Sequence, residues 1–303
     1  MNREVQAKAR LDESRCVREL VAEQGPDGGW GAFHSRSTTS KQKTPSTEVG
    51  VERALALGLD RSHPILDRAS RYIVEVMNGE RPFPDYHEKN DRWSTGMRLF
   101  LASTLSLIQP DHPLLDVDRQ LWFEIARRAF RSGAYHKEDE IHAHAELTGA
   151  TVQGSYLALN GRYQLNVLGS APGMLPAELE RALLRWLWKR PDGIGADQSI
   201  RYLEVPLSEP PPHQKPGPFD RWLASLELLA RCFPAWVDLA RDAIEWLWAQ
   251  QNEQGLWDFV RSPSSSCLPL SPTGSWRQRE DRVFDWTARA LILLSRATSG
   301  RCE

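Results

Sequence analysis

The sequence predicts an all-α protein, organised as an (α/α) toroid of five to six helical hairpins in a single domain over residues 1–303. Three observations predict this fold. Apolar residues recur at helical spacing in many runs, and loops separate these runs. No strand pair, hairpin dipeptide or long alternating segment accompanies them. A Gly-rich segment that ends a helix near the start of the chain returns near its end, and recurrence at a long period is typical of repeat folds.

The helical spacing and the residues at the ends of each run predict ten helices in chain order. In the second helix, Ser46 or Thr47 is a good N-cap and Glu48 stands in the first turn, where an acid favours the helix dipole. Asn78-Gly79 ends the third helix and Asn160-Gly161 ends the sixth, because these residues accept the conformation that terminates a helix. Segment 161–173 is ambiguous and is a candidate for a short further helix. The ten predicted helices span residues 2–24, 46–57, 64–77, 93–108, 113–130, 138–159, 175–189, 219–232, 235–251 and 283–297.

The recurring segment is Gln24-Gly25-Pro26-Asp27-Gly28-Gly29-Trp30-Gly31, which returns as Gln251-Asn252-Glu253-Gln254-Gly255-Leu256-Trp257. A weaker copy, Arg190-Pro191-Asp192-Gly193-Ile194-Gly195, has lost both the Gln and the Trp. A Gln amide both donates and accepts, Gly supplies the positive φ that ends a helix, and Trp covers apolar surface while keeping one N–H. The combination therefore predicts a brace that ties the end of one helix to the next turn of the chain.

These segments resemble the Gln-Trp repeats of the triterpene cyclase and protein prenyltransferase superfamily. Two copies match well and one matches poorly, and together they cover the organisation of most of the chain. The resemblance implies a toroid in which the repeats are structural braces. It also implies that the protein acts on or binds an isoprenoid-type apolar substrate in a central cavity. That cavity would be lined by tryptophans, of which the chain has twelve.

The more apolar helices are expected to form an inner barrel, because a helix that is apolar around most of its circumference is buried. The predicted inner helices are 46–57, 93–108, 138–159, 219–232 and 283–297, and the predicted outer helices are 2–24, 64–77, 113–130, 175–189 and 235–251. Three long loops each lead from an outer helix into an inner one, namely 33–45, 203–218 and 259–282. The starts of the inner helices should therefore gather at one mouth, where free N–H groups favour anions.

Acids, arginines and tryptophans recur at these predicted helix starts. The candidate catalytic acids are Asp91, Asp220 and Asp285, and an acid–base or metal pair on one helical face is formed by His142 and Glu146. The candidate substrate-binding residues are Arg92, Trp93, Arg221, Trp222, Trp286 and Glu48. The arginines suit an anionic group, and tryptophan faces stabilise cations or stack on sugar rings.

The usual catalytic motifs of the resembled superfamily are missing. The string nearest to D-x-D-D is Asp116-Val117-Asp118-Arg119, which lacks the last acid and lies on a predicted outer helix. There is no D-D-x-x-D for a magnesium-bound diphosphate and no D-x-C for zinc. The sequence therefore predicts no metal and no cofactor.

The composition indicates which classes of partner and which cellular compartment to expect. The formal net charge of −2 gives no reason to expect nucleic acid. The four cysteines are far apart, which fits a reducing cytoplasm. The polar N-terminus does not read as a signal peptide, and no apolar run reaches the ~20 residues of a membrane span. A cytoplasmic protein is expected.

Three functions remain open from the sequence. The first is an enzyme or binding protein for an isoprenoid-type apolar ligand. The second is a carbohydrate-active (α/α) barrel, with paired carboxylates as acid and base and tryptophans as sugar platforms. The third is a non-catalytic toroid that binds a partner through its loop face.

Overall fold

A computed structural model places helices along the whole chain, and the part that it describes contains no strand, which confirms the all-α prediction. The described residues fall into two compact units, one drawn from Met1–Glu88 and the other from Lys89–Cys267 and Arg277–Glu303. The described residues are 11–34, 46–85, 89–151, 156–171, 173–195, 203, 205–211, 216–259 and 278–299. Most of the loops 33–45 and 262–282 and the first residues of the predicted helix 2–24 lie outside these ranges.

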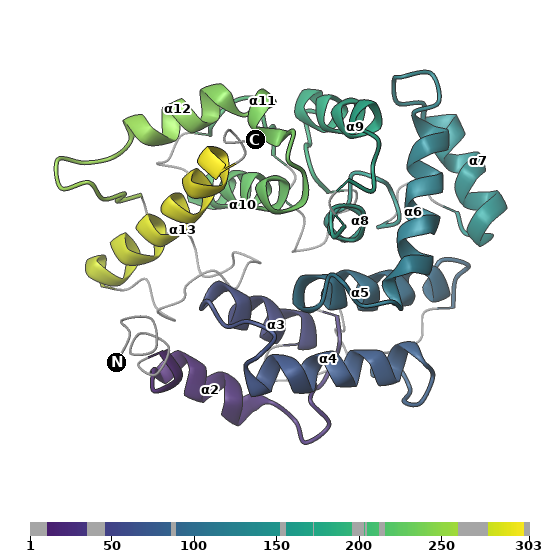
Figure 1. Ribbon diagram of the computed structural model, residues 1–303, viewed down its shortest axis with the longest axis horizontal. Coiled ribbons are helices and arrows are strands. Elements are labelled where there is room, and N and C mark those ends of the chain that lie inside the picture. The colour runs from purple at the N-terminus through teal and green to yellow at the C-terminus, as the bar shows by residue number, and fades with distance from the viewer. Residues whose placement is uncertain are drawn as a thin grey trace. The chain divides into compact units, whose positions relative to one another are not determined.

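The first unit holds three helices, α2 (Arg15–Glu23), α3 (Thr47–Ala56) and α4 (Pro64–Met77). The Ser14 hydroxyl caps α2 by accepting the Val17 N–H at 3.3 Å. Pro64 at the first position of α4 supplies a φ suited to a helix start. α3 packs on both α2 and α4 (Figure 1), so it is the central helix of this unit.

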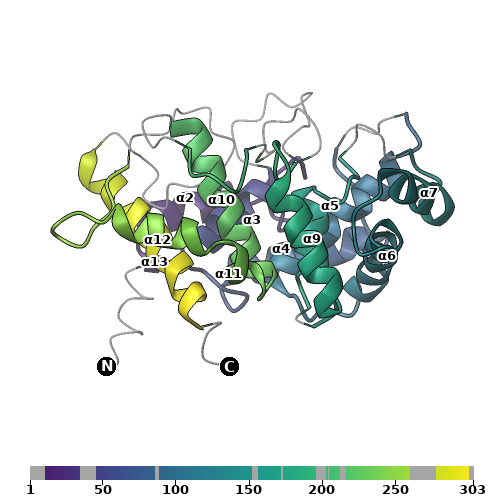
Figure 2. The same cartoon turned by 90° about the horizontal axis from the view of Figure 1, so that it is seen from above.

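The second unit is built around a series of four helices, each in contact with the next: α5, α8, α10 and α13. In Figure 1, α8 lies between α5 and α10. α6 packs on α5, α8 and α7, and Figure 2 shows α6 and α7 side by side. The helices of this unit are α5 (Trp93–Ile108), α6 (Leu115–Ala129), α7 (Lys137–Thr148), α8 (Arg162–Leu168), α9 (Ala177–Lys189), α10 (Pro216–Cys232), α11 (Trp236–Leu239), α12 (Arg241–Ala249) and α13 (Arg279–Ser299).

The predicted inner helix 138–159 is wrong in its extent. α7 ends at Thr148 because Gly149 takes a left-handed φ of 68°, which terminates a helix. α8, in the segment that was ambiguous from sequence, is buried at every residue and packs against α5 and α10. The buried place expected for 138–159 is therefore taken by α8, and α7 lies on α6.

Two other helix boundaries also differ from the sequence prediction. The predicted helix 235–251 is interrupted at the buried Ala240, between α11 and α12. No Gly or Pro marks that interruption, so the sequence gives no signal for it. α13 begins at Arg279, four residues before the predicted start.

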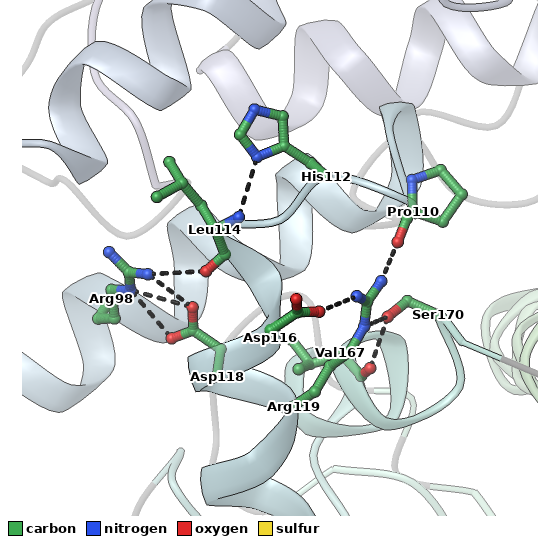
Figure 3. A network of polar contacts seen from close by, with 9 residues as sticks. All are labelled: Arg98, Pro110, His112, Leu114, Asp116, Asp118, Arg119, Val167 and Ser170. Atoms are coloured by element: carbon green, nitrogen blue, oxygen red, sulfur yellow. Dashed lines mark hydrogen bonds and ion pairs between the residues drawn. The ribbon is translucent and has the colours of Figure 1, made fainter. Parts of the chain in front are cut away.

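Asp118 and Arg119, near the start of α6, join this helix to its neighbours (Figure 3). Asp118 accepts from Arg98 of α5, with Arg98 Nη2 at 2.8 Å from Asp118 Oδ2. Arg119 donates to Asp116 at 3.0 Å and to Ser170, which follows α8, also at 3.0 Å. Burial raises the pKa of Asp118, and the hydrogen bonds and charge of Arg98 oppose that rise. Asp116 and Asp118 lie in the first turn of α6, as predicted, and together with Arg119 they join α6 to α5 and to the residues after α8.

The first Gln-Trp segment forms the predicted brace. Gln24 Nε2 donates to Gly28 O at 2.8 Å, which closes the turn after α2. The indole N–H of the buried Trp30 donates to Leu20 O at 3.1 Å, at the end of the same helix. The backbone N–H of Trp30 donates to Thr47 Oγ1 at 3.0 Å, which fixes the turn to the start of α3.

The second Gln-Trp segment repeats each of these contacts in the second unit. Gln251 Nε2 donates to Gly255 O at 2.7 Å. The Trp257 indole N–H donates to Leu247 O at 2.7 Å, and the Trp257 backbone N–H donates to Thr287 Oγ1 at 3.1 Å. The same seven-residue segment, from Gln to Trp, therefore encodes the same tie between a finished helix, a turn and the helix that follows.

The weaker third copy uses different contacts. Gly193 keeps the positive φ, at 53°, but Gly195 stands where the other copies have Trp. The Gly195 N–H donates to Asn160 O at 2.8 Å, and the Asn160 amide donates back to Gly195 O. A pair of hydrogen bonds to Asn160 thus replaces the missing indole.

Candidate functional site

An open apolar groove runs along α13 of the second unit, with a volume of about 500 Å³. Leu256, from the turn of the second brace, forms one side. Val283, Phe284, Ala288 and Leu291 of α13 form the other. Phe284 is 62% exposed and Leu291 is 49% exposed, so large apolar side chains face solvent here. Contiguous exposed apolar surface of this kind is typical of a binding site.

Polar groups stand at one end of the groove. Arg279 donates to Asp258 at 2.7 Å, and Arg282 donates to the same carboxylate at 3.1 Å. Burial alone would raise the pKa of Asp258, but the hydrogen bonds from the two guanidinium groups outweigh it and lower that pKa. The polar residues that line the groove are Asn252, Gln254, Arg279, Glu280 and Thr287.

The brace explains why the groove has this shape. Thr287 lines the groove and also accepts the Trp257 backbone N–H at 3.1 Å, so the turn is held at a fixed place beside α13. Gly255, with a φ of 76°, turns the chain so that Leu256 reaches the groove. The groove is therefore a direct product of the Gln-Trp segment and the helix after it.

The three candidate catalytic acids do not share one environment. Asp91 is exposed and accepts from the Thr151 hydroxyl at 2.6 Å and from the Thr151 N–H at 2.8 Å. The hydrogen bonds from Thr151 lower the pKa of Asp91, which suits a permanent anion and not a proton donor. Asp220 and Asp285 are fully buried. The structure thus separates Asp91 from the other two by solvent exposure.

Asp220 belongs to a buried cluster centred on Arg289. Arg289 Nη1 donates to Asp220 Oδ1 at 2.6 Å, and Arg289 Nε and Nη2 donate to the two oxygens of Glu227 at 2.7 and 2.9 Å. The guanidinium also lies over the Trp286 ring, 4.9 Å from its centre. Despite burial, which opposes it, the two carboxylates raise the pKa of Arg289. The cluster is a buried ion triad that joins α10 to α13.

The tryptophans near these acids pack against one another. Phe219 lies 4.4 Å from Phe259 and 5.4 Å from Trp286, measured between ring centres. Trp222 and Trp246 are 5.6 Å apart and edge to face. Rings at these distances are in contact. The side chains expected to line a central cavity therefore form part of the packed core of the second unit.

His142 and Glu146, the pair predicted on one helical face, are both exposed on α7. Glu146 forms an ion pair with Arg128 at 2.7 Å. The buried pair on α7 is Glu140 and His144, which has the same four-residue spacing on the opposite side of the helix. His144 Nε2 lies 3.9 Å from Glu140 Oε1.

Burial dominates the electrostatics of the Glu140–His144 pair. It lowers the pKa of His144 to about 4 and raises that of Glu140. The hydroxyl of Tyr135 and the N–H of Leu159 both donate to Glu140, and the His144 ring packs edge-on to Trp122 at 5.4 Å. The pair ties α7 to the loop before α8.

Glu48 is buried in the first unit and has its own basic partner. Its Oε2 lies 2.8 Å from His34 Nδ1. Asp85 accepts the backbone N–H groups of Phe33 and His34 at 2.6 and 2.7 Å. Burial raises the pKa of Asp85, and the two N–H groups oppose that rise. The carboxylates of Glu48 and Asp85 fix the chain after Trp30 against the start of α3.

The remaining candidate binding residues divide by burial. Trp93, Trp222 and Trp286 are buried, and the Trp222 indole N–H donates to Leu207 O at 3.2 Å. Arg92 is half-buried, with its Nε 4.0 Å from an Asp91 oxygen. Arg221 is half-buried on α10.

Sequence reasoning missed the residues of the groove. Val283, Phe284, Leu291 and Ile292 place apolar side chains on more faces of α13 than one buried stripe can cover. That excess was the available signal. The excess of apolar positions predicts a buried inner helix, whereas Phe284, Leu291 and Ile292 are exposed.

The chain matches no protein-family model, no curated protein and no solved structure. Among the described residues, no group of three or more His, Cys, Asp or Glu side chains is arranged to hold a metal ion. Within the same part of the chain, every helix is too short or too polar to cross a lipid bilayer.

Proposed function

We propose that this chain is a helical-repeat binding protein, and that it binds the apolar side chains of a protein partner in the groove along α13. The observation that carries the proposal is the open apolar groove of about 500 Å³, in which Phe284 is 62% and Leu291 is 49% exposed. Aromatic side chains such as Phe284 are enriched in the buried core of protein interfaces.

The placement of the candidate acids supports binding over catalysis at this surface. Asp220 pairs with Arg289, and Glu48 pairs with His34, in buried structural contacts. Asp91 holds the Thr151 backbone. Asp91, Asp220, Asp285 and Glu48 are all absent from the lining of the groove.

An isoprenoid-type apolar small molecule is the second candidate ligand. The groove volume lies within the range of about 300–1,000 Å³ typical of small-ligand sites, and this supports it. The resemblance of the Gln-Trp segments to terpene-cyclase repeats points to the same class of ligand.

Two neighbouring aliphatic residues of α13, Leu291 and Ile292, allow a matched comparison. Leu291 lines the groove and is 49% exposed, whereas Ile292 is 51% exposed and does not line it. A ligand can bury only the exposed half of Leu291, which is worth about 0.7–1.5 kcal/mol, so Leu291→Asp should weaken binding roughly 3- to 10-fold. Ile292→Asp should leave affinity unchanged, because its side chain points elsewhere.

The measurement is isothermal titration calorimetry of the full chain with two probes, an amphipathic helical peptide and farnesol. The proposal expects the peptide to bind in a way that Leu291→Asp weakens and Ile292→Asp does not. Farnesol binding with the same variant pattern, and no peptide binding, selects the second candidate. Binding of neither probe, or an equal loss in both variants, contradicts a binding role for the groove.

A further inference from the structure

The two braces have the same internal contacts but different surroundings. In the first unit, α4 packs on the brace: Gln24 Nε2 donates to Ile65 O at 2.8 Å, and Arg68 Nε donates to Gln24 Oε1 at 2.9 Å. In the second unit, Gln251 is exposed. Among the described residues its Oε1 accepts no hydrogen bond, and its Nε2 donates only to Gly255 O. In the part of the chain that the structure describes, Gln251 therefore lacks the contacts that Gln24 makes with α4.

The space around Gly28 in the first turn and Gly255 in the second turn differs in the same way. A Cβ at Gly28 would lie 2.5 Å from Arg68 O, so the backbone of α4 comes directly against this turn. A Cβ at Gly255 would meet only the side chain of Gln251, at 3.4 Å. Within the described ranges, nothing in the second unit covers the surface that α4 covers in the first unit.

The helices after the two braces differ in the same way. Thr47 and Thr287 accept the equivalent tryptophan N–H groups, and this fixes the register of α3 against α13. Four residues after the threonine, Val51 is completely buried in α3, whereas Leu291 of α13 is 49% exposed. The position four residues after the threonine is therefore buried in α3 of the first unit and half exposed in α13 of the second.

We propose that the groove along α13 is the seat of an amphipathic helix from a protein partner, and that this helix binds as α4 binds in the first unit. The occupant presents a backbone carbonyl to Gln251 Nε2, an arginine to Gln251 Oε1, and apolar side chains to Phe284 and Leu291. This proposal rests on the proposed function, because it names the partner of the same groove.

The charge around the groove fits an arginine-bearing helix. The segments 251–259 and 278–283 carry four carboxylates and two guanidinium groups, which leaves an acidic surplus. The carboxylates are Glu253, Asp258, Glu280 and Asp281, and the guanidinium groups are Arg279 and Arg282. Both arginines already donate to Asp258. An acidic surplus in the two segments that carry Gln251 and the start of α13 favours a cationic partner residue and disfavours an acidic one.

One side chain of the partner must differ from α4. A Cβ at Gly29 would lie 3.0 Å from the Tyr72 ring, so this tyrosine packs where the first turn has no side chain. The second turn has Leu256 at the equivalent position. The partner helix therefore needs a small residue four positions after its arginine, where α4 has Tyr72.

The test uses the full chain and a fluorescent peptide with the sequence of residues 61–80, carrying Tyr72→Ala. A hydrocarbon staple joins positions 67 and 71, both exposed in α4, because a helix of this length is marginal in water. Fluorescence anisotropy measures the affinity. Arg68→Ala in the peptide and Gln251→Ala in the protein should each weaken binding about 10-fold. The two changes together should cost little more than either alone, because they remove the same contact.

Four outcomes separate the hypotheses. Non-additive losses at Arg68 and Gln251, with a further loss in Leu291→Asp and none in Ile292→Asp, support the α4-like contact. Binding that depends on Leu291 but not on Gln251 or Arg68 overturns this inference and leaves the proposed function standing. Independent, additive losses also overturn it. No peptide binding at all overturns both.

Discussion

The two Gln residues of the braces should differ sharply in what they contribute to stability. Gln24→Ala removes the donated hydrogen bonds to Gly28 O and Ile65 O and the acceptor of Arg68. Two neutral hydrogen bonds at about 1 kcal/mol each and one charge-assisted bond at about 1.5 kcal/mol give an upper value near 3.5 kcal/mol. Water reaches this half-buried site and recovers part of it, so the expected loss is about 2–3 kcal/mol.

Gln251→Ala is the matched control in the same chain. It removes one exposed hydrogen bond, to Gly255 O, and the expected loss is about 0.5 kcal/mol or less. Urea unfolding followed by circular dichroism gives the free energies, and hydrogen exchange of α4 and α13 peptides shows which unit is destabilised. Equal losses for the two variants would refute the claim that only the first brace is engaged by a neighbouring helix.

Two further predictions concern buried charge. Burial lowers the pKa of His144 from 6.5 to about 4, so the folded chain binds fewer protons than the unfolded chain between these values. This contribution to stability is complete above pH 6.5 and is lost as the pH falls toward 4, by about 3 kcal/mol, and His144→Phe should remove it from the pH profile of the unfolding free energy. A His144→Phe chain with the wild-type pH dependence would show that another group is responsible. Asp220→Asn should cost about 3 kcal/mol in thermal or urea unfolding, because it weakens a fully buried ion pair, whereas Glu227→Gln, closer to solvent, should cost clearly less. The reverse order would contradict the central place of Asp220 in the triad with Arg289.

Local chemistry made the braces predictable from the sequence. Gln, Gly and Trp each have one property that the turn after a helix requires, and these properties do not depend on distant residues. The bounds of α4 and α5 coincide with the predicted helices because apolar spacing and the residues at their ends agree. The same logic predicted Asp116 and Asp118 as residues of a helix start.

The predicted helix ends and the predicted His–Glu pair were wrong where the sequence offers two equally good alternatives or no signal at all. Thr148-Gly149 and Asn160-Gly161 are both plausible helix ends, and the earlier one terminates α7. His142–Glu146 and Glu140–His144 have the same spacing, and α7 has too little contrast between its faces to show which pair is buried. Ala240 interrupts a helical pattern without any Gly or Pro.

The groove depends on neighbours that spacing cannot reveal. Val51 and Leu291 are similar residues at equivalent positions after their braces, and one is buried while the other is half exposed. In the first unit α4 packs on both the turn and α3, and among the described residues no equivalent helix packs on the second turn. A sequence gives the register of each helix but does not say whether its open face is covered.

Photo-crosslinking from α13 tests the binding role of the groove most directly. Benzoylphenylalanine is placed at position 284, which lines the groove, or at position 292, which does not, and each chain is irradiated with the stapled peptide. We expect a crosslinked product at position 284 and none at position 292, with mass spectrometry locating the attachment on the apolar face of the peptide. Equal crosslinking from both positions, or crosslinking from position 292 alone, would contradict a helix seated beside the second brace.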